Sequence, residues 1–525
     1  EFTSFDLDPY GRPTETGLPA LPVLRELIKI PYKAGTRLEV ISAEYKDILL
    51  SELELPPPLP LQPSQPKTKI FDGSDGFEID REFYASGTLY PAEPVQTGEA
   101  FVMRGNDMHF IVFNPVAYDP SAKMLRLYSE ITVKVEFEEG GQGRFAEFAD
   151  EAIALEETKD AAEIEGTGYL IVTHEFFAEE MERFATLKET QGYTVTVQTV
   201  QDGVSIQEIK SDIKQLYEQP GQNLGYVLFV GDVSLIPTCT GVVSGKATDL
   251  CYANMNIDWY PEIGRGRFPV STVDEAKWVV DKYIAYESIQ GSEEWLRKAA
   301  FIATCDTNNF DVAERTHNFI LNSFTLPRDY WGIFPNIPQP GGDKVYCHEY
   351  FSKLVYPREE NIKIPVNDGR SLLVYSGHGD NFTWLDFDFD IEDVSNLTIT
   401  GTLPLIASHA CLTGNFAAEA DRSLGEEWML QENKGAIAFW GATYLTYWLE
   451  DEVLEKAAFT SYFTSPEGSV TLSEMTDYAL MEVEAFSPTK AQYYWEIYNI
   501  LGDPALVVKG STVRPWIYLP LVSKE

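Results

Sequence analysis

Beyond residue 167 the sequence alternates short apolar runs with longer amphipathic segments, and this alternation limits the fold more than any other feature. The runs are too short for buried helices, so we interpret them as strands buried on both faces. Between two of them, Ser205 and Glu208 form a predicted capping box before a helix with apolar residues at Ile209 and Ile213. The pattern predicts an α/β domain over 167–510, with a mostly parallel sheet and helices on both faces. The predicted strands include 169–172, 226–230, 300–303, 372–375, 403–407 and 436–439.

The first 140 residues follow a different pattern. Residues 131–137 alternate apolar and polar side chains with a period of two, which is typical of a half-buried strand. Similar runs nearby predict an antiparallel β domain over 1–140, crossed by an extended, proline-rich surface segment at 55–66. An acidic stretch at 141–166 is a predicted linker, and 511–525 form a short C-terminal tail.

The charge balance excludes some classes of partner. The chain has 40 Lys and Arg against 82 Asp and Glu, a formal net charge of −42. Such a field repels nucleic acid and anionic membranes, so no nucleic-acid partner is expected. No apolar run is long enough for a transmembrane segment. No charged-then-apolar signal segment is found at the first residues of the sequence, so we expect either a cytosolic protein or a signal peptide that has been removed.

The five cysteines form no C-x-x-C pair, which makes a zinc site unexpected. Their odd number leaves at least one thiol outside any internal disulfide. If Cys411 is the free thiol, the other four can form two disulfides or none, and the sequence leaves both open.

A histidine and a cysteine stand just after two of the predicted strands. His378 follows 372–375, and Cys411 follows 403–407. One strand–helix–strand crossover between them would place both strand ends side by side, where α/β sheets gather functional groups. A thiol needs a nearby base to attack a carbonyl, and histidine can supply it. A small buried cysteine and a turn histidine also fit the spacing, so both interpretations stay open at this point.

The motifs around these residues resemble those of the gingipain-type cysteine peptidases, which belong to the caspase, legumain and clostripain clan. The resemblance rests on 375–379 and 408–416, supported in the same order along the chain by 169–172, 258–268 and 501–506. Residues 105–137 resemble the N-terminal prodomain of that family. The resemblance implies a caspase-like catalytic domain and a cysteine endopeptidase made as a zymogen.

The resemblance also assigns catalytic roles by position. Cys411 corresponds to the nucleophile and His378 to the catalytic histidine. The backbone N–H groups of Gly379 and Cys411 correspond to the oxyanion site. Asp249 falls near the acid that orients the histidine, where a carboxylate would fix the imidazole tautomer.

For the substrate pocket, Asp258 corresponds to an acid at the base of S1, so the expected substrates are proteins or peptides with a basic P1 residue. Arginine is the expected preference, because it can meet a carboxylate bidentately, and lysine is an alternative. Ser376, His409 and Trp448 are expected to line this pocket. A protonated His409 would repel a cationic substrate.

The family resemblance further implies that the prodomain inhibits the enzyme until it is cut, and Arg144 and Lys159 are candidate activation sites. No cofactor is required for the chemistry, and structural calcium is an expectation without a location. The protein is expected to be secreted or at the cell surface. The competing hypotheses are a transpeptidase of the same family and a catalytically inactive surface binding protein.

Overall fold

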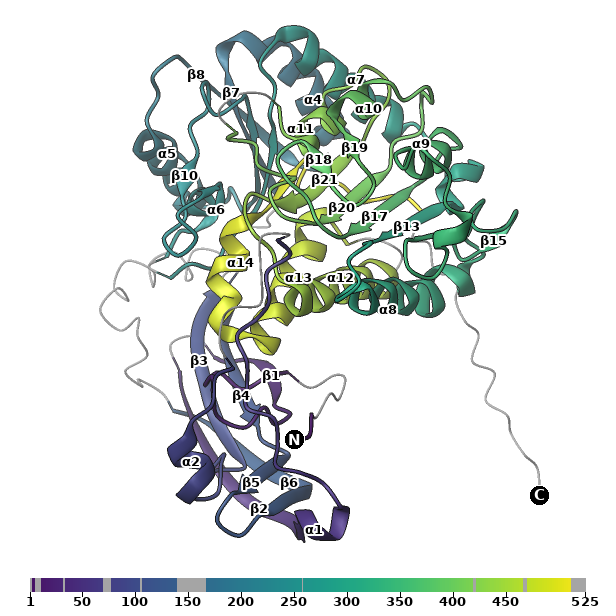
Figure 1. Cartoon of the computed structure of the whole chain (residues 1–525). Helices are drawn as coiled ribbons and strands as arrows, with labels where there is room; N and C mark the ends of the chain where they lie inside the picture. The colour runs from purple at the N-terminus through teal and green to yellow at the C-terminus, as the bar shows by residue number, and fades with distance from the viewer. Residues whose placement is uncertain are drawn as a thin grey trace, which may run out of the picture.

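The computed structural model describes residues 2–4, 11–31, 34–68, 77–103, 106–138, 167–256, 258–418, 422–465 and 470–510. An N-terminal β region lies below a larger α/β domain (Figure 1). The predicted linker at 141–166, with Arg144 and Lys159, and the tail at 511–525 lie outside the described residues.

The N-terminal region is built from antiparallel sheets, as its alternating pattern predicts. One described sheet has the order β1 (Leu24–Lys29), β4 (Asn106–Phe113) and β3 (Val95–Met103). Another has the order β2 (Gly35–Leu49), β6 (Met124–Glu138) and β5 (Val116–Asp119). The short helices α1 (Leu50–Leu53) and α2 (Arg81–Ser86) accompany them.

The described part of the α/β domain centres on a sheet in which all neighbouring strands are parallel except β21 and β22. The predicted fold class is therefore confirmed. In order across the sheet, the strands are β16 (Asp343–Tyr346), β13 (Ala299–Ala303), β17 (Leu372–Ser376), β20 (Leu405–His409), β21 (Ala438–Ala442), β22 (Tyr498–Leu501), β12 (Gly264–Phe268), β9 (Leu224–Val230), β7 (Gly168–His174) and β8 (Thr194–Val200).

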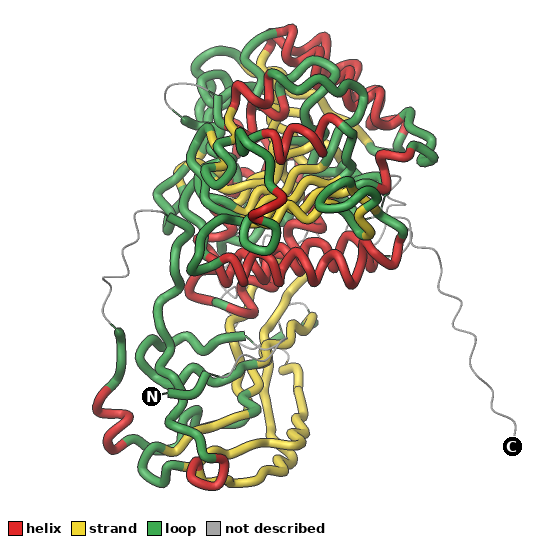
Figure 2. The backbone as a smooth tube through the Cα atoms, turned by 45° about the vertical axis from the view of Figure 1, so that its right-hand side comes forward, coloured by secondary structure: helices red, strands yellow, loops and turns green. Residues whose placement is uncertain are grey.

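Helices cover both faces of this sheet. Side chains on both faces of β7 are therefore buried, which explains why the sequence of such a strand is an unbroken apolar run. Leu170 packs in one buried cluster with Ile209 of α5, while Ile171 packs in another with Met181 of α4. Figure 2 shows the helices enclosing the strands. The helices are α4 (Ala178–Thr190), α5 (Ile206–Glu218), α6 (Leu250–Ala253), α7 (Val273–Glu287), α8 (Phe310–Ile320), α9 (Glu360–Asn367), α10 (Ile391–Ser395), α11 (Leu424–Met429), α12 (Trp448–Thr464), α13 (Leu472–Phe486) and α14 (Ala491–Ile497).

Short two-residue strands occur in the loops between these elements: β10 (Cys239–Thr240), β11 (Ala247–Thr248), β14 (Trp331–Gly332), β15 (Gln339–Pro340), β18 (Thr383–Trp384) and β19 (Phe389–Asp390).

The antiparallel pairing of β21 with β22 divides the sheet into two halves that run in opposite directions. Strands β13, β17, β20 and β21 are parallel, so their carboxyl ends lie at one edge. Strands β7, β9 and β12 run the other way. Residues that follow β13, β17 and β20 in the sequence are therefore brought together in space.

The proline-rich segment links the two regions. It leaves the N-terminal sheets and rises into the α/β domain (Figure 1). The sequence predicts that 55–66 crosses the surface, and these residues range from exposed to buried. Lys67, which follows the segment, is enclosed at 1% exposed. Elsewhere the two regions meet through Phe101 of β3, which stacks on Tyr260 at 4.0 Å, and through Arg25 of β1, which donates to the carbonyl of Ala485 in α13.

Candidate active site

His378 and Cys411 follow the carboxyl ends of β17 and β20, and both side chains contact the carbonyl oxygen of Lys67. Each residue follows its strand by two positions, and the strands pair in register with Ser376 opposite His409. His378 Nδ1 lies 3.0 Å from the carbonyl oxygen of Lys67, and Cys411 Sγ lies 3.1 Å from the same oxygen. The structure thus places both predicted residues against the oxygen of one peptide carbonyl, the kind of group that a cysteine nucleophile attacks at its carbon.

The thiol is enclosed in this arrangement. Cys411 is 1% exposed, and burial raises the pKa of its thiol to about 11. The backbone N–H of Thr446 donates to Sγ at 3.3 Å. The next residue, Leu412, has φ 64°, a left-handed conformation that side chains other than glycine rarely adopt. With Lys67 in place, the thiol is protonated at neutral pH and therefore a weak nucleophile.

Asp306 supplies the carboxylate that meets the imidazole. Its Oδ2 lies 3.1 Å from His378 Nε2. The N–H of Asn308 and the side-chain amide of Asn309 also donate to Asp306, at 2.8 Å and 3.1 Å. Although burial opposes it, these hydrogen bonds and the contact with His378 lower the pKa of Asp306. The carboxylate is therefore ionised and able to fix the orientation of the ring.

Asp249, which the sequence suggests for this role, has a different partner. Arg267 holds it with two hydrogen bonds, Nε to Oδ2 and Nη2 to Oδ1, both at 2.8 Å. The remaining donors of Arg267 reach the carbonyl oxygens of Gly231 and Ile236. Both carboxylate oxygens are committed to this buried pair, and Arg267 lies on β12, which runs opposite to β17 and β20. We therefore correct the orienting acid from Asp249 to Asp306.

A pocket beside the dyad receives the ammonium group of Lys67. Lys67 Nζ lies 2.9 Å from Asp451 Oδ2. It donates to Ser376 Oγ at 3.1 Å and to the carbonyl oxygen of His409 at 2.8 Å. The ring of Trp448 forms a wall, with its centroid 4.7 Å from Nζ. The structure brings Ser376, His409 and Trp448 together around one cation, as expected for S1.

The acid at the base of this pocket is held in place by two tyrosines. Asp451 Oδ1 accepts from Tyr494 at 3.0 Å and from Tyr498 at 2.8 Å, which leaves Oδ2 for the cation. Asp451 lies in the first turn of α12, where the helix dipole stabilises negative charge. A buried ammonium is tolerated only beside such a compensating carboxylate.

Asp258, the acid that the sequence suggests for S1, does not lie at this pocket, where the carboxylate beside the ammonium group is that of Asp451. Asp258 Oδ2 accepts from the N–H of Val102 in β3 at 3.3 Å, and its Oδ1 accepts from the N–H of Tyr260 at 3.1 Å. Burial raises the pKa of Asp258 to about 6. The side chain therefore caps a loop against the N-terminal region.

His409 contributes to the pocket only through its backbone. Its ring is fully buried, and burial lowers its pKa to about 3. The imidazole is therefore neutral at physiological pH. The repulsion that a protonated His409 would exert on a cationic side chain does not arise.

Gly379 lies directly against the nucleophile. A Cβ atom at this position would lie 2.9 Å from the carbonyl oxygen of Cys411 and 2.7 Å from Thr413 Cγ2. Only glycine therefore allows this close approach. The carbonyl oxygen of Lys67 meets the thiol and the imidazole in this structure, and the oxyanion role of the Gly379 and Cys411 N–H groups stays a prediction.

All five cysteines lie within the described residues, and four of them are paired. Cys239 is bonded to Cys251, and Cys305 is bonded to Cys347. Cys411 is the free thiol. The Cys305–Cys347 disulfide joins the carboxyl ends of β13 and β16, next to Asp306.

A further acid organises the loop of the catalytic histidine. Asp386 is 4% exposed, and its Oδ2 accepts from the N–H of His378 at 2.8 Å and from Tyr375 at 3.1 Å. It also accepts from Thr304 at 2.8 Å. Sequence reasoning missed Asp386, Asp306, Asp451 and Lys67. Position after a strand was a usable signal only for Asp306, which follows β13 as His378 follows β17.

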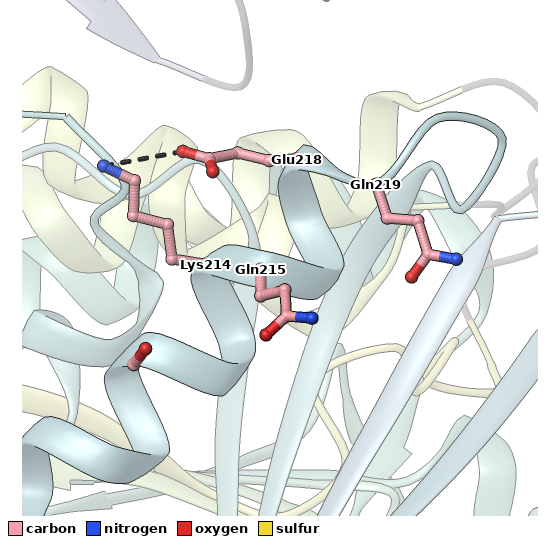
Figure 3. A pocket seen from close by; sticks show the side chains of 5 residues that line it. Lys214, Gln215, Glu218 and Gln219 are labelled. Atoms are coloured by element: carbon pink, nitrogen blue, oxygen red, sulfur yellow. Dashed lines mark ion pairs between the residues drawn. The ribbon is translucent and has the colours of Figure 1, made fainter.

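Other features of the described residues lie outside this chemistry. A shallow hollow on the outer face of α5 is lined by Lys214, Gln215, Glu218 and Gln219 (Figure 3) and holds no catalytic residue. Within the described ranges, no group of three or more His, Cys, Asp or Glu is arranged to hold a metal ion. Structural calcium stays a prediction, tested by whether a chelator lowers Tm. No described helix is both long and apolar enough to cross a bilayer.

The chain matches known peptidases in sequence. The family model Peptidase family C25 matches residues 163–509, and the Propeptide_C25 model matches residues 11–154. Gingipain R2 from Porphyromonas gingivalis is 26% identical over 94% of this chain and 68% of its own length. Lys-gingipain from the same organism is 23% identical over 94% of this chain, but the match spans 30% of its own length.

Solved structures agree in fold. The crystal structure of the Arg-specific cysteine proteinase gingipain R superposes with a TM-score of 0.56 at 22% identity, over 66% of this chain and 79% of that one. The complex of the Porphyromonas gingivalis RgpB pro- and mature domains gives 0.57 at 24% identity, over 65% and 80%. The family models cover both regions of the molecule, and the chain belongs to peptidase family C25, a cysteine endopeptidase with its own propeptide.

Proposed function

We propose that this protein is the latent form of an endopeptidase that cleaves after basic residues and prefers lysine at P1. One observation carries the proposal: Lys67 places its ammonium on Asp451 while its carbonyl oxygen contacts His378 and Cys411. The N-terminal region thus binds as a substrate would, with Lys67 as P1. The sequence-based preference for arginine rested on Asp258, which lies elsewhere.

The hydrogen-bond partners in the pocket support lysine over arginine. The lysine chain already reaches Asp451 Oδ2, Ser376 Oγ and the carbonyl oxygen of His409 with its single nitrogen. The second oxygen of Asp451 is occupied by Tyr494 and Tyr498. A guanidinium would need both oxygens for a bidentate pair, so it gains less here than at an open carboxylate.

Catalysis follows from the same groups once the N-terminal segment has left. His378 takes the proton of Cys411, and the thiolate attacks the carbonyl carbon of the P1 residue. Asp306 holds the imidazole and stabilises its cation. His378 then returns the proton to the leaving amine, and water hydrolyses the thioester. The N–H groups of Gly379 and Cys411 are the proposed donors to the developing oxyanion.

Latency follows from the position of Lys67. Its side chain fills S1, and its backbone N–H donates to the carbonyl oxygen of Thr446 at 2.7 Å. The propeptide therefore competes with every substrate for the same groups. Activation requires its displacement. Cleavage at Lys159 would match the proposed P1 preference more closely than cleavage at Arg144.

An exported location is part of the proposal. The Cys239–Cys251 and Cys305–Cys347 disulfides support it, because such bonds persist mainly in oxidising compartments. Fractionation of the producing cells, with detection of the protein in the medium and at the cell surface, tests this part separately.

The test of function is hydrolysis of fluorogenic peptides that differ only at P1, with Lys, Arg, Asn, Asp or Leu. The full-length chain and Cys411→Ala are assayed before and after incubation, and N-terminal sequencing locates any cut. Fast cleavage of the Lys peptide that Cys411→Ala abolishes is expected. Cleavage only of the Asn or Asp peptide would contradict the pocket assignment. Transfer of the acyl group to an added amine, in place of hydrolysis, would identify a transpeptidase.

A further inference from the structure

The propeptide segment before Lys67 pairs with the catalytic domain through an antiparallel bridge. Lys67 donates its N–H to the carbonyl oxygen of Thr446, and Gln65 accepts from the N–H of Trp448 at 3.2 Å. Pro66 lies opposite Tyr447. This pairing is the usual way in which an extended peptide is held by main-chain hydrogen bonds. With Lys67 as P1, Ser64 occupies the P4 position.

At Ser64 the catalytic domain presents a buried carboxylate. Glu450 is 0% exposed and lies in the first turn of α12. Its Oε1 accepts from the hydroxyl of Ser64 and, at 3.0 Å, from the hydroxyl of Ser487 in the loop after α13. Its Oε2 has no hydrogen-bond partner among the described residues. A buried carboxylate oxygen without a donor is costly, so this atom is an acceptor for any donor that reaches it.

We propose that Glu450 forms an S4 subsite that selects a hydrogen-bond donor at P4 and rejects an acidic residue. This inference rests on the proposed function, because it takes Lys67 as the mimic of P1. A substrate that replaces the propeptide would place its P4 side chain where Ser64 lies. A hydroxyl, amide or ammonium there can donate to Glu450, whereas Asp or Glu would bring a second negative charge against it.

Two consecutive residues in the first turn of α12, Glu450 and Asp451, would therefore contact two different substrate positions. Asp451 meets P1 and Glu450 meets P4, because successive side chains on a helix point in directions about 100° apart. The extended segment spans the distance between them. Ser487 belongs to the catalytic domain and donates to the same Oε1 as Ser64, so this hydrogen bond to Glu450 does not depend on the substrate.

The first experiment uses the full-length latent chain and a readout that needs no turnover, the rate at which iodoacetamide alkylates Cys411. Ser64→Ala removes one hydrogen bond to Glu450, and Ser64→Asp adds repulsion. We expect alkylation to rise about fivefold in Ser64→Ala and at least about tenfold further in Ser64→Asp, as loss of a charge-assisted bond and a like-charge contact imply. In the Ser64→Asp chain, Glu450→Gln should return the rate close to that of Ser64→Ala.

The matched control is Glu452→Gln on the same helix. Glu452 pairs with Arg315 and Lys456 and has no contact with the propeptide segment in the described structure. In the Ser64→Asp chain, Glu452→Gln should leave the alkylation rate high. Equal rates in Ser64→Ala and Ser64→Asp, or a return of the rate by Glu452→Gln, would overturn the proposal.

The second experiment measures hydrolysis by the activated enzyme of tetrapeptides X-Gln-Pro-Lys with a fluorogenic leaving group. With X as Ser, Ala and Asp, kcat/KM should fall in that order by about tenfold per step, the change that one charge-assisted contact gives. Glu450→Gln should abolish the penalty for Asp. Equal hydrolysis of all three peptides would refute the S4 subsite while leaving lysine specificity intact. Alkylation rates that follow the predicted order, with no lysine peptide cleaved, would retain the contact and refute the proposed function.

Discussion

Among the buried acids of the described structure that hold a cation, Asp249 and Asp451 do so for different reasons. Asp249 and Arg267 belong to the same domain and form a bidentate pair closed by backbone carbonyls. Asp451 meets Lys67, which arrives from the N-terminal region. The first pair is complete within the catalytic domain. The second is complete only while the propeptide is present, and in the proposed function its acid receives a substrate cation when the propeptide leaves.

The comparison shows how to tell a structural carboxylate from a binding one. Burial and a cationic partner are common to both acids. The two acids differ in the hydrogen-bond donors that remain when the propeptide segment is removed. Asp249 keeps Arg267, while Asp451 keeps Tyr494 and Tyr498 on one oxygen only. The oxygen of Asp451 that no other described side chain would hold, close to His378 and Cys411, supports the proposed specificity pocket.

Neutralising each acid gives the largest expected difference between Asp249 and Asp451. Asp451→Asn should lower kcat/KM for a Lys peptide by about 10³-fold, because it leaves a substrate ammonium buried without its counter-charge. Asp249→Asn should instead lower the free energy of unfolding by about 3 kcal/mol and leave the ratio of Lys to Arg cleavage unchanged. Peptide kinetics and denaturant unfolding of both variants measure this. A changed P1 ratio in Asp249→Asn would return that residue to the active site.

The next effect concerns the acid that replaces Asp249 as the partner of His378. Asp306→Asn should lower kcat by about 10²-fold with little change in KM, because the amide no longer stabilises the imidazolium. Asp306→Glu should restore part of the activity. The pH profile of kcat is the readout, because a purely structural role of Asp306 would not shift the pH at which kcat begins to fall. An unchanged profile in Asp306→Asn would contradict the assignment.

Removing the cation from the second pair tests latency. In the full-length chain, Lys67→Ala opens the pocket and exposes Cys411, whose pKa burial raises to about 11. Exposure lowers this pKa, so more thiolate is present at pH 8, by about tenfold for each unit that the pKa falls. Alkylation at pH 8 should therefore accelerate, and the difference from wild type should shrink as the pH approaches 11. Equal rates at pH 8 would show that Lys67 does not protect the thiol.

The smallest predicted effect comes from the disulfides. Cys305→Ala with Cys347→Ala frees the strand ends that carry Asp306 and should lower kcat about threefold, because positioning errors reduce the rate more than binding. Cys239→Ala with Cys251→Ala is the matched control and should leave kcat unchanged, although both double variants lose stability. Equal losses of kcat in the two double variants would contradict a positioning role for the Cys305–Cys347 bond.

Local sequence patterns predicted much of the fold and both members of the His378–Cys411 pair, but not the acid that contacts His378. Period-two alternation predicted the antiparallel β region, and short apolar runs predicted the strands of the α/β domain. His378 and Cys411 were predicted because each directly follows such a run, and parallel neighbouring strands end at the same edge of a sheet. These signals are carried by residues close together in the sequence.

The sequence by itself determined the fold class, the family and the residues placed at strand ends. Only the tertiary structure decided which carboxylate serves which cation. Asp249, Asp258, Asp306 and Asp451 are alike as sequence letters, and their roles depend on partners brought near by folding. Lys67 and Asp451 are joined by a segment that crosses from one region to the other, and no local periodicity encodes that contact. Electrostatic pairing depends on distance and burial in three dimensions, and this is why the pocket acid could not be identified from spacing.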